Sequence, residues 1–290
     1  MIKRAEIAKD TLHKHSKTFS FASFFLGDET VNKVARLYSF CRAVDDIADE
    51  GECIGIARKN LNSISKDLEL GMSSNEITSD FLLLASECNI DVHAARELLE
   101  GVMCDLDPVI MIDEQALDHY CYQVAGTVGL MMCPILGVTD SNALMYACDL
   151  GKAMQLTNIC RDIHEDALRE RIYIPQTLLQ VGITKEPTKK KEEMEMARAC
   201  QKLLLRADIL YEKAELGLAY LPLRSKICIL VASRLYKAIG TKLLKKNCRY
   251  WEGRVFTTRS EKIILTVRML LSLWVNPKFW IKKPYAKDKM

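Results

Sequence analysis

The placement of proline restricts this chain to folds built from long helices. Proline is disfavoured inside helices because its ring removes a backbone donor and clashes with the preceding turn. The first of the seven prolines stands at position 108, so the first third of the chain is free to form uninterrupted helices. The remaining prolines are Pro134, Pro175, Pro187, Pro222, Pro277 and Pro284.

Apolar residues recur at helical spacing within these proline-free stretches. In VARLYSFCRAVDDIAD, residues 34–49, they recur every three or four positions, as in an amphipathic helix. In ALMYACDLGKAMQLTNICRDI, residues 143–163, they occupy two sides, as in a central buried helix. Alternating strand patterns are scarce, and no repeat or long linker is visible. We therefore expect an all-α fold with one domain over residues 1–290. Breaks between helices are expected near Gly27-Asp28, Gly51–Gly55, Gly71–Asn75, Asp107-Pro108, Gly137–Ser141, Pro175 and Gly182–Lys191.

Charge and cysteine content exclude several functional classes. The formal net charge is +3, from 41 basic and 38 acidic residues, whereas nucleic-acid-binding proteins usually concentrate positive charge. The 11 cysteines are scattered and form no CxxC pair, which argues against both a disulfide framework and a zinc site. No signal peptide and no run of about 18 apolar residues is visible. We expect a cytoplasmic protein that does not bind nucleic acid.

The first candidate site is an acidic cluster in CRAVDDIADE. Asp45 and Asp49 are four residues apart and share one helix face, while Asp46 points about 100° away. Two like charges at that spacing repel unless a cation lies between them. A solvated acidic helix face explains this cluster, taken alone, equally well.

The second candidate site is NICRDIHED, in which amide and carboxylate oxygens repeat along one face. Asn158, Asp162 and Asp166 stand at positions i, i+4 and i+8 of the expected helix, and Arg161 lies on its flank. Such oxygen ligands suit Mg²⁺, which retains waters and substrate phosphates in its coordination shell. Two facing clusters of this kind would hold a diphosphate between them, and cations would neutralise charge that grows on it during ionisation.

At these residues the sequence resembles the squalene and phytoene synthase family, most closely the bacterial phytoene synthases. Asp45 and Asp49 match the DxxxD of its first motif, and QLTNICRDIHEDALRERIYIP, residues 155–175, matches its second. YCYQVAGTVGLMM, residues 120–132, and HSKTFSFAS, residues 15–23, resemble its central and N-terminal segments. The likeness extends over roughly residues 10 to 260. It implies a class I isoprenoid synthase helical bundle with a central cavity.

The resemblance also implies residue roles. The metal ligands would be Asp45, Asp49, Asn158, Asp162 and Asp166, with Mg²⁺ as the ion and Mn²⁺ as an alternative. Tyr120 and Tyr173 would lie near the reacting carbons or the leaving group, as catalytic residues beside the four aspartates. Substrate would be held by His15, Ser16, Lys17, Thr18, Phe19, Tyr38, Arg42, Gln155, Arg161, Arg171, Tyr236 and Arg254. Phe19, Val124, Leu130 and Met154 are plausible cavity-wall positions.

Simpler explanations remain open for several of these residues. A helical ion pair with Asp45 explains Arg42 about as well as phosphate binding, and Arg171 has Glu170 and Asp166 within reach. Tyr120 is compatible with an ordinary core position. Gly126 and Gly129 indicate either a close approach of substrate or tight packing between helices, because glycine inside a helix otherwise costs about 1 kcal/mol relative to alanine.

The expected reaction is the head-to-head (1-1′) condensation of two prenyl diphosphates through a cyclopropylcarbinyl diphosphate. The favoured product is phytoene, formed from two geranylgeranyl diphosphates in carotenoid biosynthesis without NADPH. Squalene or dehydrosqualene synthesis from farnesyl diphosphate is the alternative. Asp45-Asp46-Ile47-Ala48-Asp49 also reads as the DDxxD of cyclases and chain-elongating prenyltransferases. A non-catalytic helical assembly factor is the alternative from another class.

The C-terminal segment mixes aromatic residues with lysines. Residues 270–290 contain Trp274, Phe279, Trp280 and Tyr285, a composition that suits a membrane interface. We therefore expect this segment to form an interfacial tail that places the protein peripherally on the inner face of the membrane. Enzymes acting later in the same pathway are further candidate partners.

Overall fold

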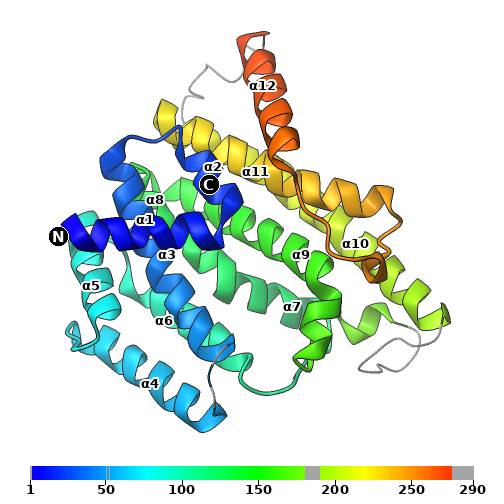
Figure 1. Cartoon of the computed structure of the whole chain (residues 1–290), viewed down its shortest axis with the longest axis horizontal. Helices are drawn as coiled ribbons and strands as arrows, with labels where there is room; N and C mark the ends of the chain where they lie inside the picture. Colours follow the sequence, from blue (N-terminus) through cyan, green and yellow to red (C-terminus); the bar gives the residue numbers. More distant parts are fainter. Residues whose placement is uncertain (1, 50, 52, 180–189, 276–290) are drawn as a thin grey trace, which may run out of the picture.

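The computed structural model describes residues 2–49, 51, 53–179 and 190–275, and they are almost entirely helical (Figure 1). The α-helices are α1 (Ile2–His15), α2 (Lys17–Ser23), α3 (Asp28–Asp49), α4 (Ile54–Leu70), α5 (Glu76–Cys88), α6 (Val92–Cys104), α7 (Glu114–Cys121), α8 (Thr127–Ile135), α9 (Leu144–Leu168), α10 (Lys190–Glu215), α11 (Leu223–Lys245) and α12 (Arg259–Val275). A π-helical turn, η1 (Tyr122–Gly126), joins α7 to α8, and short 3₁₀ turns are η2 (Ser141–Ala143), η3 (Gln176–Leu178), η4 (Leu216–Tyr220) and η5 (Tyr250–Glu252). The expectation of an all-α fold is confirmed.

Local sequence signals explain where these helices begin and end. The side chains of Asn75, Asp91 and Asp113 accept hydrogen bonds from the first-turn amides of α5, α6 and α7, as N-caps do. Gly71 ends α4 in the left-handed conformation (φ 69°), which glycine adopts without steric cost. The breaks expected before residue 180 all fall between helices, whereas most of Gly182–Lys191 lies outside the described residues.

The central helix of the bundle is α9. It contacts α7, α8, α10 and α11, and it runs through the middle of the molecule in Figure 1. Ala153, Leu156, Ile159 and Cys160 are all at most 2% exposed. This agrees with the expectation of a helix that is apolar on two sides, because a helix packed on several sides must bury more than one stripe.

Glycine permits the helices around α9 to approach it closely. A Cβ atom on Gly151 of α9 would lie 2.2 Å from the carbonyl oxygen of Ala125 in η1. A Cβ on Gly129 of α8 would lie 2.4 Å from the carbonyl oxygen of Ala147. Gly126 would similarly meet the Cys148 sulfur at 2.8 Å. Of the two explanations left open for Gly126 and Gly129, the structure shows the helix-packing contact.

Two short strands connect parts of the chain that are far apart in sequence. β1 (Val109–Ile110) pairs in parallel with β2 (Arg171–Ile172), with Val109 opposite Arg171. The amide of Val109 donates to the carbonyl of Glu170 at 3.1 Å, and the amide of Met111 donates to that of Ile172 at 3.1 Å. The ladder therefore places the end of α6 beside the residues that follow α9.

The final helix, α12, projects from the body of the bundle (Figure 1). Its last residues, 270–275, are the start of the expected interfacial tail, while residues 276–290 lie outside the described residues. Among the described helices, none combines the length and the apolar character needed to cross a bilayer.

Candidate active site

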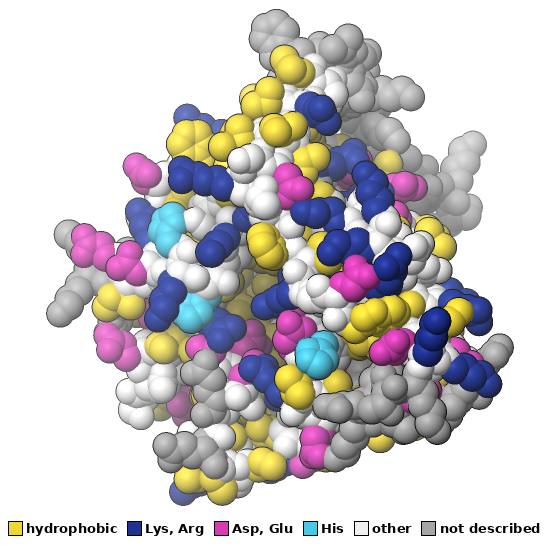
Figure 2. All heavy atoms as spheres, turned by 45° about the vertical axis from the view of Figure 1, so that its right-hand side comes forward, with side chains coloured by type: hydrophobic (Ala, Val, Ile, Leu, Met, Phe, Trp, Pro, Cys, Tyr) yellow, Lys and Arg dark blue, Asp and Glu magenta, His cyan; other side chains and the backbone are white. Residues whose placement is uncertain are grey.

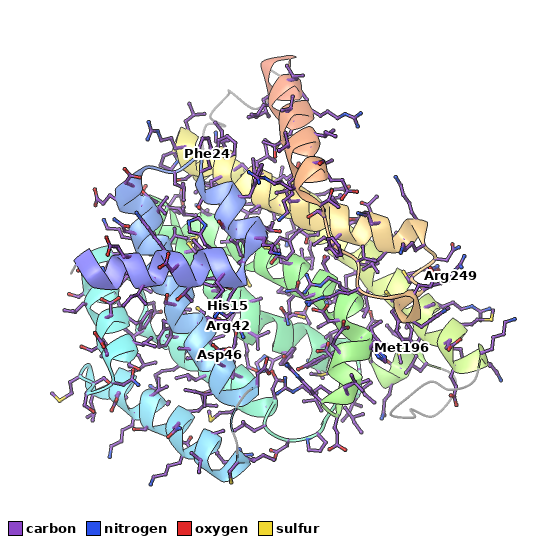
Figure 3. The ribbon with its side chains drawn as sticks, viewed as in Figure 1. His15, Phe24, Arg42, Asp46, Met196 and Arg249 are labelled. Carbon is purple, nitrogen blue, oxygen red and sulfur yellow. The ribbon has the colours of Figure 1, made fainter. Side chains whose placement is uncertain are left out.

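The first acidic cluster lies on the C-terminal half of α3. Burial raises the pKa of Asp45 to about 7, and the neighbouring charge of Asp49 adds to this shift. Asp46 lies on another side of the helix, where it forms an ion pair with Arg42 one turn earlier. Arg42 is therefore in a helical ion pair, as the simpler explanation held, but its partner is Asp46 and not Asp45. Figure 3 shows the two side chains following one another along α3, with His15 over the same part of the helix in that view.

Two arginines that follow α9 reach across to the first cluster. Arg171 Nη1 lies 2.6 Å from Asp49 Oδ1, and Arg169 Nη1 lies 2.8 Å from Asp49 Oδ2. Arg171 is only 8% exposed, whereas the side chain of Arg169 is 51% exposed. The partner of Arg171 is thus neither of the nearby carboxylates, Glu170 and Asp166, but one that precedes it by 122 residues. This contact ties the first acidic cluster to the segment that follows the second.

The second acidic cluster lies where α9 bends. Asp162 has non-helical backbone angles (φ −107°, ψ 15°), so the even spacing expected for Asn158, Asp162 and Asp166 on one straight face is interrupted at its middle member. The Asp162 carboxylate is held from two sides. Arg161 donates to it at 2.7 and 2.5 Å, and Arg254 donates at 2.8 and 3.0 Å.

Asp166 and Asn158 flank this arginine-bound carboxylate and lack comparable partners. Burial raises the pKa of Asp166 to about 7, with a further contribution from the charge of Asp162. The amide nitrogen of Asn158 donates to Gln155 at 3.3 Å, whereas its buried carbonyl oxygen Oδ1 has no hydrogen-bond partner. A buried polar atom without a partner is costly in a finished structure, which makes Oδ1 a candidate ligand atom.

One further tyrosine lies near each acidic cluster. Tyr38 of α3 lies within electrostatic range of Arg42, Asp45 and Tyr236, and burial raises its pKa to about 12. Tyr236 of α11 lies within range of Arg161, Asp162 and Arg254. The ring of Phe19 packs on Tyr236 with centroids 5.3 Å apart. Tyr38 therefore lies near the first cluster and Tyr236 near the second, with Phe19 packed on Tyr236.

The expected N-terminal segment begins where α1 ends. His15 is the last residue of α1 and is exposed, and Lys17 is exposed at the start of α2. Ser16 is the N-cap of α2, and its hydroxyl accepts a hydrogen bond from the amide of Phe19 at 3.3 Å. Thr18 is half-buried. The observed contacts of Ser16 are those of a helix cap, so its assignment to substrate stays a prediction.

Tyr120 and Tyr173 meet at a carboxylate that the sequence did not identify. Their rings stack with centroids 4.8 Å apart, and their hydroxyls lie 3.0 Å from each other. The Tyr173 hydroxyl donates to Asp105 Oδ1 at 2.6 Å, and the Tyr120 hydroxyl donates to Asp105 Oδ2 at 2.8 Å. One sequence signal could have identified Asp105: it is a carboxylate at the C-terminal end of a helix, where the helix dipole disfavours negative charge.

The carboxylate and amide oxygens of the two clusters are suitable ligands for a divalent cation, although their present positions do not form a complete metal site. Within the described part of the chain, no three histidine, cysteine or acidic side chains are gathered as a metal site. Asp49 and Asp162 are turned toward arginines, while Asp45 and Asp166 carry raised pKa values that a nearby cation would lower. Carboxylate and amide oxygens are the ligands that Mg²⁺ prefers.

Apolar and charged side chains meet on one face of the molecule. Figure 2 shows a face that is hollowed near its centre, with hydrophobic side chains at the floor and charged side chains of both signs around it. Of the candidate wall residues, Phe19, Val124 and Leu130 are half-buried, and Met154 is 9% exposed.

Comparisons with known proteins all place this chain among the same group of enzymes. The family model described as squalene/phytoene synthase matches residues 12–261. A 15-cis-phytoene synthase of Enterobacter agglomerans is 35% identical over 269 residues, which cover 87% of this chain and 90% of that protein. A phytoene synthase of Rhodobacter capsulatus is 30% identical over 282 residues, covering 92% and 81% of the two chains.

A solved dehydrosqualene synthase structure shares this fold, with a TM-score of 0.81 and 23% identity over 94% of this chain and 98% of that one. The match of the family model agrees with the extent of the likeness expected from the motifs, and the helical architecture is that of the class I isoprenoid synthases. The chain belongs to the squalene/phytoene synthase family of prenyltransferases.

Proposed function

We propose that this enzyme joins two prenyl diphosphates head to head, with geranylgeranyl diphosphate as the donor and phytoene as the product. One observation supports the reaction above the others: α3 and α9 bring two acidic clusters together, linked by Arg171 and Arg169. The choice of phytoene follows the bacterial relatives, which are named phytoene synthases.

In this proposal Asp45, Asp49, Asn158, Asp162 and Asp166 hold Mg²⁺. When bound, the ions neutralise the charge that develops on the diphosphate as its allylic C–O bond breaks. The arginines that pair with Asp49 and Asp162 then become available to the diphosphate oxygens, with which guanidinium groups form two-point hydrogen bonds. The same arginines would thus neutralise carboxylates before substrate arrives and phosphates afterwards.

Product analysis tests this proposal. Purified protein is incubated with Mg²⁺ and either geranylgeranyl or farnesyl diphosphate, with and without NADPH. We expect phytoene from the twenty-carbon donor without NADPH, and no product when a chelator removes the metal. Squalene or dehydrosqualene would reassign the donor length, and a cyclic or longer diphosphate product would favour a cyclase or an elongating enzyme. Mn²⁺ in place of Mg²⁺ identifies the preferred ion.

We further propose that the protein attaches peripherally to an anionic membrane through α12. Ile263, Ile264, Val267 and Leu271 are all at least 47% exposed and lie on one face of this projecting helix, flanked by exposed Arg259 and Arg268. An apolar stripe beside cations is typical of interfacial helices, and it precedes the aromatic and lysine residues of the expected tail.

Liposome sedimentation tests the attachment. We expect binding to vesicles with anionic lipid that falls at least about tenfold in the Ile264→Glu/Leu271→Glu variant, because charge opposes insertion at the interface. Leu205→Glu is the matched control, since Leu205 is a 58% exposed aliphatic residue on α10. Equal binding of both variants and the unaltered protein would exclude α12 as the attachment surface.

A further inference from the structure

The geometry around Asp105 points to a function that none of the sequence motifs assigns. We propose that Asp105 is a positioning residue of the condensation reaction. Its carboxylate accepts the hydroxyl protons of Tyr120 and Tyr173, so that both phenol oxygens direct their lone pairs toward the cationic hydrocarbon and carry increased negative charge. This inference rests on the proposed function, because it concerns the stage at which a carbocation rearranges.

Asp105 follows directly after α6 and is half-buried. Each of its carboxylate oxygens accepts one tyrosine hydroxyl, at 2.6 Å from Tyr173 and 2.8 Å from Tyr120. A hydroxyl has one proton, so donation to Asp105 leaves the lone pairs of each phenol oxygen to act as acceptors. Hydrogen bonds to a carboxylate are stronger than neutral ones and increase the negative character of the donor oxygen.

The two phenols are fixed in place by the surrounding structure. Tyr120 and Tyr173 are 5% and 6% exposed, and their rings stack with centroids 4.8 Å apart. Tyr120 lies on α7, and Tyr173 directly follows β2. Reorientation of either hydroxyl therefore depends on its acceptor and not on movement of the ring.

The backbone of Asp105 connects this group to the diphosphate side of the site. Its carbonyl oxygen accepts hydrogen bonds from Arg171 Nη2 at 2.9 Å and Nε at 3.1 Å, and the same guanidinium binds Asp49. Burial raises the pKa of Asp105, although the Tyr173 hydroxyl, Arg171 and the Tyr120 hydroxyl each oppose that shift. The groups that compensate the carboxylate are therefore the two tyrosine hydroxyls that it positions and the arginine that its own backbone carbonyl binds.

The two phenol oxygens would attract a carbocation and would not attract a diphosphate. A phenol oxygen held by a carboxylate presents its negative end, which stabilises a nearby carbocation by preorganised electrostatics. It offers no attraction to a phosphate oxygen. Asp105 is therefore expected to matter after the leaving group has departed, and to contribute little to binding of the diphosphate.

The Asp105→Asn variant tests this assignment because asparagine preserves the shape but accepts through one oxygen only. We expect hydrocarbon formation to fall about 10²-fold, the effect of misplacing groups around a reacting centre. Consumption of the prenyl donor should fall much less, so that the cyclopropylcarbinyl diphosphate or water-captured alcohols accumulate. The KM for the donor should stay within about threefold of the unaltered value.

Asp107→Asn is the matched control. Asp107 lies two residues further along, is exposed, and pairs with Arg58 at 2.8 Å. An equal loss of donor consumption and hydrocarbon formation in folded Asp105→Asn protein would overturn the assignment, as would activity equal to that of Asp107→Asn. An unaltered protein that converts no prenyl diphosphate would refute the proposed function itself.

Phenylalanine variants keep the test decisive if Asp105→Asn does not fold. Tyr120→Phe and Tyr173→Phe retain the stacked rings and remove one hydroxyl each. We expect both to lower hydrocarbon formation more than donor consumption, and the double variant to lose less than the product of the two single effects, because the hydroxyls share one acceptor. Two variants that lower both rates equally would contradict the inference.

Discussion

Of the two aspartates that each cluster would offer to a metal, Asp45 and Asp49 on α3 and Asp162 and Asp166 on α9, arginines hold one and not the other. Asp49 pairs with Arg169 and Arg171, and Asp162 pairs with Arg161 and Arg254. Asp45 and Asp166 form no ion pair with any described residue, and burial raises the pKa of each to about 7.

The two clusters differ in where their arginines originate. Those of Asp49 come from the residues after α9, so the first cluster is anchored to the second. Those of Asp162 come from α9 itself and from the loop after α11, at a point where α9 is bent. The α3 cluster lies on a regular helix, whereas the geometry of the α9 cluster depends on a distant loop. The arginine-bound carboxylates should therefore contribute most to the stability of the metal-free protein, whereas the unpaired ones can bind a metal ion without breaking an ion pair.

The largest expected effect comes from an unpaired carboxylate. Asp45→Asn should lower hydrocarbon formation by about 10³-fold, because it removes a metal ligand worth several kcal/mol. The same change should raise the free energy of unfolding of the metal-free protein at pH 8 by about 1 kcal/mol, since it removes a charge that burial disfavours. Turnover assays and denaturant titration measure the two quantities.

Asp46→Asn is the control for this change, because Asp46 pairs with Arg42 on another side of α3. We expect its activity to fall less than about tenfold, the scale of a partly exposed ion pair. Equal losses in the two variants would favour the DDxxD function of the alternative prenyltransferase classes.

A smaller difference is expected between Arg171 and Arg169, the two arginines that pair with Asp49, in their effect on stability. Arg171→Ala should lower the free energy of unfolding by about 3 kcal/mol, because it leaves Asp49 without its buried partner and the Asp105 carbonyl without two donors. Arg169→Ala should change it by less than about 1 kcal/mol, because that side chain is half exposed. Similar losses from both variants, in chemical denaturation, would show that burial does not distinguish them.

The smallest effect concerns pH. A carboxyl group whose pKa is higher in the folded than in the unfolded state makes folding less favourable as pH rises from about 4 to about 7. Asp45 and Asp166 therefore destabilise the metal-free protein at neutral pH, and a cation should relieve this. We expect saturating Mg²⁺ to raise the melting temperature by about 5 °C at pH 8 and by much less at pH 5.5. Thermal scans in the presence and absence of Mg²⁺ measure this, and a larger shift at pH 5.5 would contradict it.

The helices could be predicted from the sequence, but several site contacts could not. Proline placement and apolar spacing are local signals, and they identified α3 and α9 correctly. The bend at Asp162 has no glycine or proline to mark it. For Arg171 the sequence indicates diphosphate binding or, more simply, an ion pair with Glu170 or Asp166, whereas the structure pairs it with Asp49. Asp105 belongs to no motif, and its function depends on tyrosines 15 and 68 residues further along the chain.

The most direct test of the proposed site is a crystal structure with Mg²⁺ and an unreactive thiodiphosphate analogue of the donor. We predict metal ions between the diphosphate and the oxygens of Asp45, Asp49, Asn158, Asp162 and Asp166, with Arg171 and Arg254 turned from their carboxylates to the phosphates. A diphosphate bound away from both clusters, with the pairs Arg171–Asp49 and Arg254–Asp162 unchanged, would contradict it.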